Sequence, residues 1–489
     1  MKLRKILGAS GAAALLLAAT GRAEKLTLDD AIRTALEHNQ TVKVVDYGRK
    51  IARANVTAAW GQFDPTIDFH DQFSDDATPS PELPLGTPLN VKSRDIGVAL
   101  DGLTPWGLTY SIGSSRGRLA GEPGTFLPES FMSGDSVTIT QPLLRGFGFG
   151  ANLYNVRVAK ADRAISDANY RQGLIDLVTN VIIAYNDLIQ AHEGARIAVL
   201  YRDEVARLAA DNERRFRAGA VAEADVIQAR AQAASLEEQV IIAVRSLRDS
   251  ENQLRRLMGG SHFEVNGPEI DLAPPADVRP ITAQPDLDIK TAFIKRPDYE
   301  SFRQNVYKQK AARSLANNAL LPRVDVVASA GYNGLDETYR ASWDQVRGDQ
   351  NRSRSIGLVV SVPLTFTEGR GKVRAARLTV RQSEEDLRRL EADIALEITT
   401  DAAQLETTRA RVESLKNAYL LTDQTLQAEI KRLKAGTGDT FVILQKQQDL
   451  ANIEYRQIAA ISDQRKAIAT YQRALGTTLE VNHVGLAAE

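Results

Sequence analysis

Apolar residues recur at helical spacing over long parts of the chain. One series returns every seven residues, at Val226, Ala233, Val240, Leu247 and Leu254, and a second series is interleaved with it. This heptad spacing is typical of a helix that packs lengthwise against another helix. The pattern therefore predicts a long helix that follows a turn near Gly219.

A still longer helix is predicted before that turn. Leu174, Val178, Val181, Tyr185 and Leu188 alternate four and three residues apart, and a second isoleucine stripe runs beside them. Two adjacent stripes indicate a helix with neighbours on two sides, as in the wall of a helical tube. A helix over residues 151–217 would be roughly 100 Å long at about 1.5 Å per residue, which is more than a compact domain needs.

Four segments instead alternate apolar and polar residues, which predicts strands with two unlike faces. Each adjoins a proline at a change from helix to strand or back, namely Pro65, Pro142, Pro322 or Pro363. The pattern favours a barrel whose outside meets lipid. Two strands in each half give about four per chain, too few to close a barrel, and open edges in hydrocarbon leave backbone groups unpaired. Several copies must then share one barrel.

An additional hairpin is predicted at Asp95–Ser115. Two alternating segments flank the turn-like stretch Asp101–Gly107, and the second half of the chain has no counterpart. The sequence leaves three alternatives open for this hairpin. It lengthens an outer loop, covers the barrel mouth or changes the number of strands.

The chain is also predicted to contain two copies of one plan. At an offset of 217 residues, Arg215–Gly219 matches Arg432–Gly436, and the match continues without gaps to Gly259 and Gly476. The predicted organisation is a signal peptide at 1–23, a first repeat at 24–259, a proline-rich linker at 260–285, a second repeat at 286–476 and a tail at 477–489. Each repeat contains a helix, strands and a long helical hairpin.

The first residues predict export from the cytoplasm. Lys2, Arg4 and Lys5 precede an apolar run that ends before Gly21-Arg22-Ala23, the pattern of a removable Sec-type signal peptide. No later stretch is expected to supply the roughly 18 apolar residues of a membrane-spanning helix. The chain has no cysteine, which excludes both disulfides and a lipid-bearing cysteine.

Composition and motifs give no sign of catalysis. The formal net charge of -1, with 25% charged residues, gives no indication of nucleic-acid binding. Gly146–Gly150 lacks the spacing of a phosphate-binding loop and is interpreted as a strand-to-helix bend. His192-Glu193 has Arg196 where a zinc helix needs its second histidine. We expect no catalytic, cofactor or metal site.

Together these residues resemble the outer-membrane efflux protein family, the TolC-like channels. The resemblance rests on the paired glycine turns, Ala184–Leu188, the junction Gln141–Gly146 and the duplicated order. It implies an α+β membrane protein, namely a homotrimer with a twelve-stranded barrel in the outer membrane and a long periplasmic α-helical barrel. It also implies outer-membrane lipid around the barrel, a periplasmic adaptor (membrane fusion protein) and an inner-membrane pump of RND or ABC type as partners.

The resemblance further implies roles for the two helical turns. The turns would form a periplasmic tip that closes and opens the duct and meets the adaptor. The tyrosine and arginine positions of the family's closing network are Leu433 and Gly438 here, and its acidic pore rings fall on Val442 and Gln445, so a different gate is expected. The implied tip and gate residues are Gly219, Asp225, Leu433, Gly436, Gly438, Asp439, Val442 and Gln445. The implied adaptor contacts are Arg217, Ala218, Gly219, Lys434, Ala435, Gly436 and Thr437.

The predicted function is a passive exit duct for small molecules or polypeptides, without enzyme activity. The alternative is a periplasmic coiled-coil adaptor or scaffold without a pore. This alternative does not explain the four strand segments, which argue against it. The sequence does not choose between drug efflux and type I polypeptide secretion.

Overall fold

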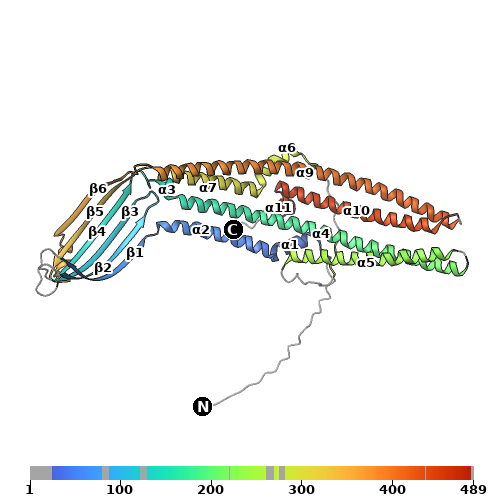
Figure 1. Cartoon of the computed structure of the whole chain (residues 1–489), viewed down its shortest axis with the longest axis horizontal. Helices are drawn as coiled ribbons and strands as arrows, with labels where there is room; N and C mark the ends of the chain where they lie inside the picture. Colours follow the sequence, from blue (N-terminus) through green and yellow to red (C-terminus); the bar gives the residue numbers. More distant parts are fainter. Residues whose placement is uncertain are drawn as a thin grey trace, which may run out of the picture. The chain divides into compact units, whose positions relative to one another are not determined.

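A computed structural model describes residues 25–79, 88–121, 129–219, 221–259, 269–274, 281–435 and 437–485 (Figure 1). The predicted signal peptide, most of the predicted linker and Gly436 lie outside these ranges. The chain divides into two compact units. Unit 1 comprises residues 1–39, 177–282 and 404–470, and unit 2 comprises 40–176, 283–403 and 471–489.

One antiparallel sheet dominates unit 2. Its strands pair in chain order, β1-β2-β3-β4-β5-β6, so β1 and β6 are the two edges. The bounds are β1 Thr66–Pro79, β2 Pro88–Leu103, β3 Thr109–Gly121, β4 Ser130–Pro142, β5 Arg323–Asp336 and β6 Asn351–Ser361.

The predicted strand count is wrong. The hairpin near residues 95–115 forms β2 and β3, which are inserted between the two expected strands of the first half. The first half thus supplies four strands and the second half two, in place of two each. Of the three alternatives for the hairpin, the change in strand number is the one observed.

Unit 2 also contains helices before, between and after the strands. They include α2 (Gln40–Trp60), the 3-10 helix η1 (Gly61–Phe63), α3 (Phe149–Asn152), α6 (Pro285–Lys295), α7 (Pro297–Ala319), α8 (Tyr339–Arg347) and α11 (Thr478–Val481). The part of α4 (Tyr154–Arg217) up to Asp176 and the part of α9 (Thr367–Lys434) up to Ala403 also belong to this unit.

The connection from β4 to α3 confirms the predicted bend at Gly146–Gly150. Gly146 N donates to Asn318 Oδ1 at 2.8 Å, and Gly148 N donates to Trp106 O at 2.9 Å. Asn152 Nδ2 donates to the carbonyls of Gly146 and Gly148 at 2.7 and 2.9 Å. Neighbouring chain segments thus satisfy the backbone of the bend.

Unit 1 consists of long helices. It contains α1 (Leu28–His38), α5 (Glu223–Met258), nearly all of α10 (Thr440–Leu475) and the remaining parts of α4 and α9. Helix α4 is one continuous helix of 64 residues, and α9 has 68. The two helices predicted from apolar spacing are confirmed, although the duplication of the two halves stays a prediction.

The heptad residues form the core of unit 1. Val226 and Leu254 are buried on α5, and Val181 and Leu188 are buried on α4. One cluster joins three helices, with Tyr201 and Val205 of α4, Leu236 of α5 and Leu444 of α10 among its members. The apolar stripes therefore hold the helical hairpins together.

Among the described residues, one stretch, in α4, is long and apolar enough to cross a membrane by length and composition. The sequence analysis expected no such stretch after the signal peptide, and by length and composition this expectation is not met. However, 61% of that stretch is buried within the protein, as in the core helix of a soluble fold.

Candidate functional site: the two-faced sheet and the helical turns

One face of the sheet is apolar, and we call it the apolar face. The register places Ile67, Leu100, Ile112, Val137 and Ala330 in one row across β1 to β5, so all five point to the same side. These side chains are open to the surroundings, with Ile67 74% exposed. Other large apolar residues of this face are Phe69, Phe73, Val98, Ile139, Ile356, Leu358 and Val360.

The opposite side, which we call the polar face, has small and polar residues. Thr66, Asp101, Ser111, Thr138 and Ser329 form one of its rows, which continues to Ser355 on β6. Hydrogen bonds cross this face, as between the hydroxyls of Ser329 and Ser355 at 2.7 Å. Such a face suits water, whereas the apolar face suits hydrocarbon.

Aromatic residues border the apolar face at both ends. Tyr110 lies toward the end where the strands join the long helices, with Trp106 in the adjoining turn, while Phe73, Phe131 and Tyr332 lie toward the other end. Aromatic rings at both borders of an apolar band are typical of a sheet that crosses a membrane.

Helix α8, between β5 and β6, covers the far end of the apolar face. The hydroxyls of Ser133 and Ser342 meet at 2.7 Å, and Gly334 leaves room for the α8 backbone beside it. Arg116 and Arg347 lie 4.8 and 5.6 Å from the ring of Trp343. The sequence analysis missed this helix, although Thr338 before an amphipathic segment was a usable signal, because its hydroxyl caps the helix.

The turn after α4 lies in unit 1. Gly219 has a φ of +73°, a left-handed conformation that favours glycine after a helix. Arg217 pairs with Glu213 at 2.8 Å, and Arg230 of α5 pairs with the same carboxylate at 2.8 Å. Arg230 and then Arg217 lower the pKa of Glu213, so this carboxylate stays charged and links the two helices beside the turn.

Asp225 and Asp439 each bond to their own chain. Asp225 Oδ2 accepts a hydrogen bond from Ala222 N at 3.3 Å, and Asp439 Oδ1 accepts one from Phe441 N at 2.9 Å. Both carboxylates thus satisfy backbone groups next to a helix N-terminus, where negative charge is favourable. No ion pair of either aspartate occurs within the described ranges.

The turn after α9 explains why position 438 is glycine. A Cβ at Gly438 would lie 2.5 Å from Leu433 N and 2.8 Å from its Cα, so no other residue fits without movement. Thr437 N donates to Arg432 O at 3.1 Å and closes the turn. The two departures from the family's closing network, Leu433 and Gly438, thus contact each other.

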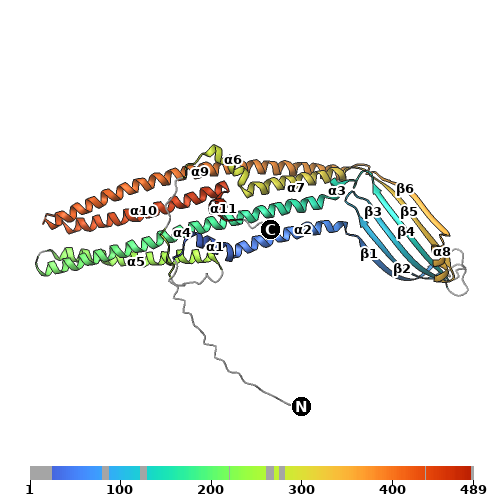
Figure 2. The same cartoon turned by 180° about the vertical axis from the view of Figure 1, so that it is seen from behind.

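The remaining predicted gate residues lie on α10. Val442 is partly buried and Gln445 is exposed, on the first turns of the helix. The turns after α4 and α9 lie at the same end of unit 1 (Figures 1 and 2). Lys434, Ala435 and Thr437 complete the described part of the second turn.

Away from the turns, in the helical core of unit 1, burial raises the pKa of Tyr201 to about 12.

In the described part of the chain, no group of three or more His, Cys, Asp or Glu side chains is placed to hold a metal ion.

The prolines predicted at the strand-helix junctions fall where expected. Pro65 precedes β1, Pro142 ends β4, Pro322 precedes β5 and Pro363 follows β6.

A two-faced antiparallel sheet with aromatic borders, followed in the chain by pairs of very long helices, defines an outer-membrane channel protein. The sequence profile of the outer membrane efflux protein family matches residues 89–260 and 289–477. The chain belongs to this family, whose members are channels rather than enzymes, and the resemblance inferred from the sequence is confirmed.

Individual relatives agree with this assignment. CzcC, a cobalt-zinc-cadmium resistance protein of Cupriavidus metallidurans, is 23% identical over 333 residues, covering 67% of this chain and 74% of CzcC. Outer membrane protein TolC of Escherichia coli is 22% identical over 325 residues, covering 63% and 64%. The CmeC outer membrane channel of Campylobacter jejuni has a similar fold, with a TM-score of 0.71, 15% identity and coverage of 92% and 86%.

Proposed function

We propose that the protein is the outer-membrane exit duct of a tripartite export system. It conducts small molecules or polypeptides passively from a periplasmic adaptor and an inner-membrane pump to the outside. In this proposal a signal peptide at residues 1–23 is removed on export, and anchoring comes from the sheet without a lipid.

The observation that supports this function best is the two-faced sheet with two open edges. The apolar face suits lipid and the polar face suits a water-filled lumen. Along the outer edges of β1 and β6, no pairing occurs in the described ranges. Unpaired backbone groups in hydrocarbon cost several kcal/mol each, so further copies must close the barrel.

A homotrimer of this chain would build a wider barrel than the twelve strands that the family resemblance implied. Three copies of a six-stranded sheet contribute eighteen strands. Barrels of 16–18 strands leave an aqueous channel. The long helices of the three copies would then form the periplasmic duct.

The turns after α4 and α9 would form the periplasmic tip in this proposal. Arg217, Ala218 and Gly219 of one turn, and Lys434 to Thr437 of the other, would contact the adaptor. Leu433 packs on Gly438 where the family has an ion-paired lock, so closure would depend on the packing of the turns. Asp225 and Asp439 would support it as helix caps.

The cargo is a separate question. Relatives include a cobalt-zinc-cadmium resistance protein, so divalent cations belong among the substrates to be tested. The polar face of the sheet carries aspartates, including Asp68 and Asp101, which would suit cations.

Two measurements test the duct. Detergent-extracted protein should run as a trimer, and the purified trimer should conduct ions in planar bilayers. A monomer without conductance would refute the proposal. Membrane fractionation separates it from the alternative, since a periplasmic adaptor or scaffold without a pore would stay in the soluble periplasmic fraction.

A further inference from the structure

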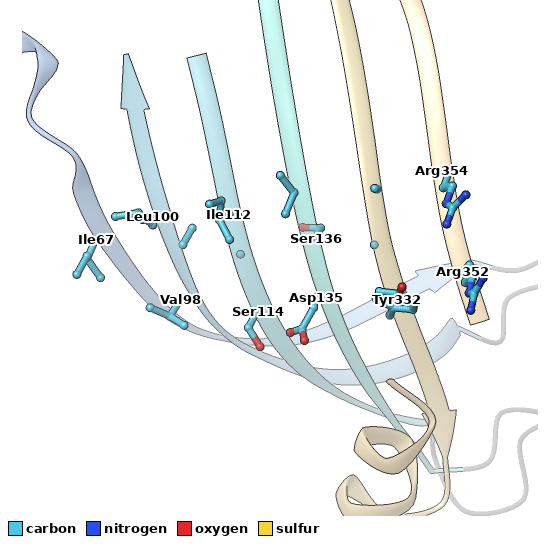
Figure 3. Close-up of a pocket in the computed structure, with 15 residues that line it drawn as sticks. Ile67, Val98, Leu100, Ile112, Ser114, Asp135, Ser136, Tyr332, Arg352 and Arg354 are labelled. Carbon is cyan, nitrogen blue, oxygen red and sulfur yellow. The ribbon is translucent and has the colours of Figure 1, made fainter. Parts of the chain in front are cut away.

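A groove of about 640 Å³ crosses the apolar face of the sheet (Figure 3). Ile67, Val98, Leu100 and Ile112 line it on β1 to β3, where Ser114 is the polar side chain among the lining residues. At the opposite edge of the sheet, on the same face, it ends at the guanidinium groups of Arg352 and Arg354 on β6. The groove therefore changes from apolar to cationic along its length.

The groove crosses the strands along two neighbouring rows of the register, one from Ile67 to Arg354 and one from Val98 to Arg352. These rows meet successive strands at different distances from the strand ends. Ile67 is the second residue of β1, next to the helices that precede the sheet, whereas Arg352 is the second residue of β6, next to α8. The apolar end of the groove thus lies toward the long helices, and the cationic end lies toward α8. In a sheet that spans a membrane, such a groove leads from the hydrocarbon to one membrane surface.

The two arginines at the cationic end are available to an anion. Arg352 is 57% exposed, and its nearest carboxylate is Asp349 at 4.0 Å. Arg354 is exposed and makes no ion pair in the described part of the chain. The free energy of a guanidinium group beside an apolar surface is lowered when an anion pairs with it. The planar fork of this group matches the geometry of phosphate oxygens.

One carboxylate also lines the groove, between the apolar end and the arginines. Asp135 of β4 is half-buried, and its Oδ1 has no hydrogen-bond partner among the described residues. An ordinary glycerophospholipid offers ester carbonyls at this depth, which cannot donate. A lipid with hydroxyl or amide groups between its acyl chains and its phosphate could donate to this carboxylate, whereas the hydroxyls of phosphatidylglycerol lie beyond the phosphate.

We propose that the groove binds a phosphorylated glycolipid of the outer membrane. Its acyl chain lies on Ile67, Leu100 and Ile112, its phosphate pairs with Arg352 and Arg354, and its hydroxyl or amide groups meet Asp135. This inference rests on the proposed function in one respect, because the apolar face must be turned toward lipid.

The test compares lipid retention by purified trimers with native mass spectrometry. The probes are lipid A (an acylated, phosphorylated disaccharide), its dephosphorylated form and phosphatidylglycerol. Arg352→Gln with Arg354→Gln should bind lipid A about tenfold more weakly, because two charge-assisted contacts are lost. Arg352→Lys with Arg354→Lys should retain part of the binding, since the charge remains and the fork is lost.

Arg340→Gln with Arg347→Gln is the matched control. It removes the same charge from α8, outside the residues that line the groove, and should bind lipid A like the unchanged protein. Equal losses in the two double variants would overturn the site, as would unchanged binding in the first. Equal binding of phosphatidylglycerol or of dephosphorylated lipid would overturn the choice of lipid.

Conductance of the same variants keeps the two proposals apart. If Arg352→Gln with Arg354→Gln inserts and conducts but binds lipid A as before, the groove inference fails and the duct stands. If the unchanged protein neither inserts nor conducts, the proposed function itself fails.

Discussion

Gly438 is the predicted gate residue whose identity is explained most directly by the geometry of its turn. Its replacement by alanine should disturb the turn after α9, because a Cβ would lie 2.5 Å from Leu433 N. Overpacking of this kind lowers the stability of the folded state by about 1–3 kcal/mol, and here the loss falls on one turn. Limited proteolysis and amide hydrogen exchange should show faster opening at residues 432–442.

Gly371→Ala is the control for that experiment. No atom of the chain outside its own helix lies within 4 Å of a Cβ at Gly371, and the residue lies inside α9. Alanine should stabilise this helix by up to about 1 kcal/mol. Equal protection of the turn in both variants would show that Gly438 is not required by close packing.

Asp401 gives a prediction about pH. Burial raises its pKa above the ordinary 3.8, and Glu397 adds to the rise, whereas Arg473 and Arg296 oppose it. A raised folded pKa means that folding takes up protons, so this group costs stability as the pH rises through the folded pKa. Asp401→Asn should therefore raise Tm by a few degrees at most at neutral pH.

The gain in Tm from Asp401→Asn should disappear in acid, because the carboxyl of Asp401 is then protonated and neutral, like the amide that replaces it. Asp393→Asn, an exposed change on the same helix, should shift Tm little at any pH. Thermal unfolding followed by circular dichroism across pH measures both. A gain that persists below the folded pKa would exclude the ionised carboxylate as its cause.

Among the elements, the long helices could be predicted and the sheet only in part. Residues such as Val181 and Leu254 recur at fixed spacing, and the spacing alone specifies a packed helix. The hairpin of β2 and β3 was also visible, but its place in the sheet depends on pairing between strands distant in sequence. Nothing in a local pattern sets that pairing.

The candidate site shows the same division. The sequence placed both turns and the apolar and polar alternation of the strands. It could not show that Gly438 packs on Leu433, or that Arg352 and Ile67 share one groove, because these contacts join residues through backbone geometry and strand register. The family resemblance suggested gate positions, which stay a prediction, whereas geometry explains the glycine found at position 438.

The polar face of the sheet predicts the selectivity of the channel. It carries Asp68, Asp76, Asp95, Asp101 and Asp325, whereas its basic residues in the described strands are His70 and Arg323. Such a lumen should favour cations. Asp68→Asn with Asp101→Asn should move the reversal potential in a salt gradient toward that of a non-selective pore.

The matched control for selectivity removes the same charge from the other face. Asp71→Asn with Asp75→Asn changes residues of β1 on the apolar face, so the reversal potential should move little. An equal shift in both variants would mean that the polar face does not line the lumen. The comparison therefore tests the orientation of the sheet directly.

For the whole molecule, the decisive question is how the sheet closes. Side chains already fill the interior of a barrel with eight strands, and a six-stranded barrel closed by a single chain would be narrower still. Since β1 and β6 run in opposite directions, β6 of one copy can continue the antiparallel pattern with β1 of the next. The edges therefore predict pairing between copies.

Cysteine cross-linking measures that pairing without background, because the chain contains no cysteine. A protein with Phe69→Cys on β1 and Leu358→Cys on β6 should form covalent bands of two and three chains on oxidation. Cysteine at Ile356 or Val360 covers other registers between copies. Either substitution alone should give no ladder, since one edge cannot link to itself. A product cross-linked only within single chains would show that each sheet closes on itself, and the eighteen-stranded barrel would be wrong.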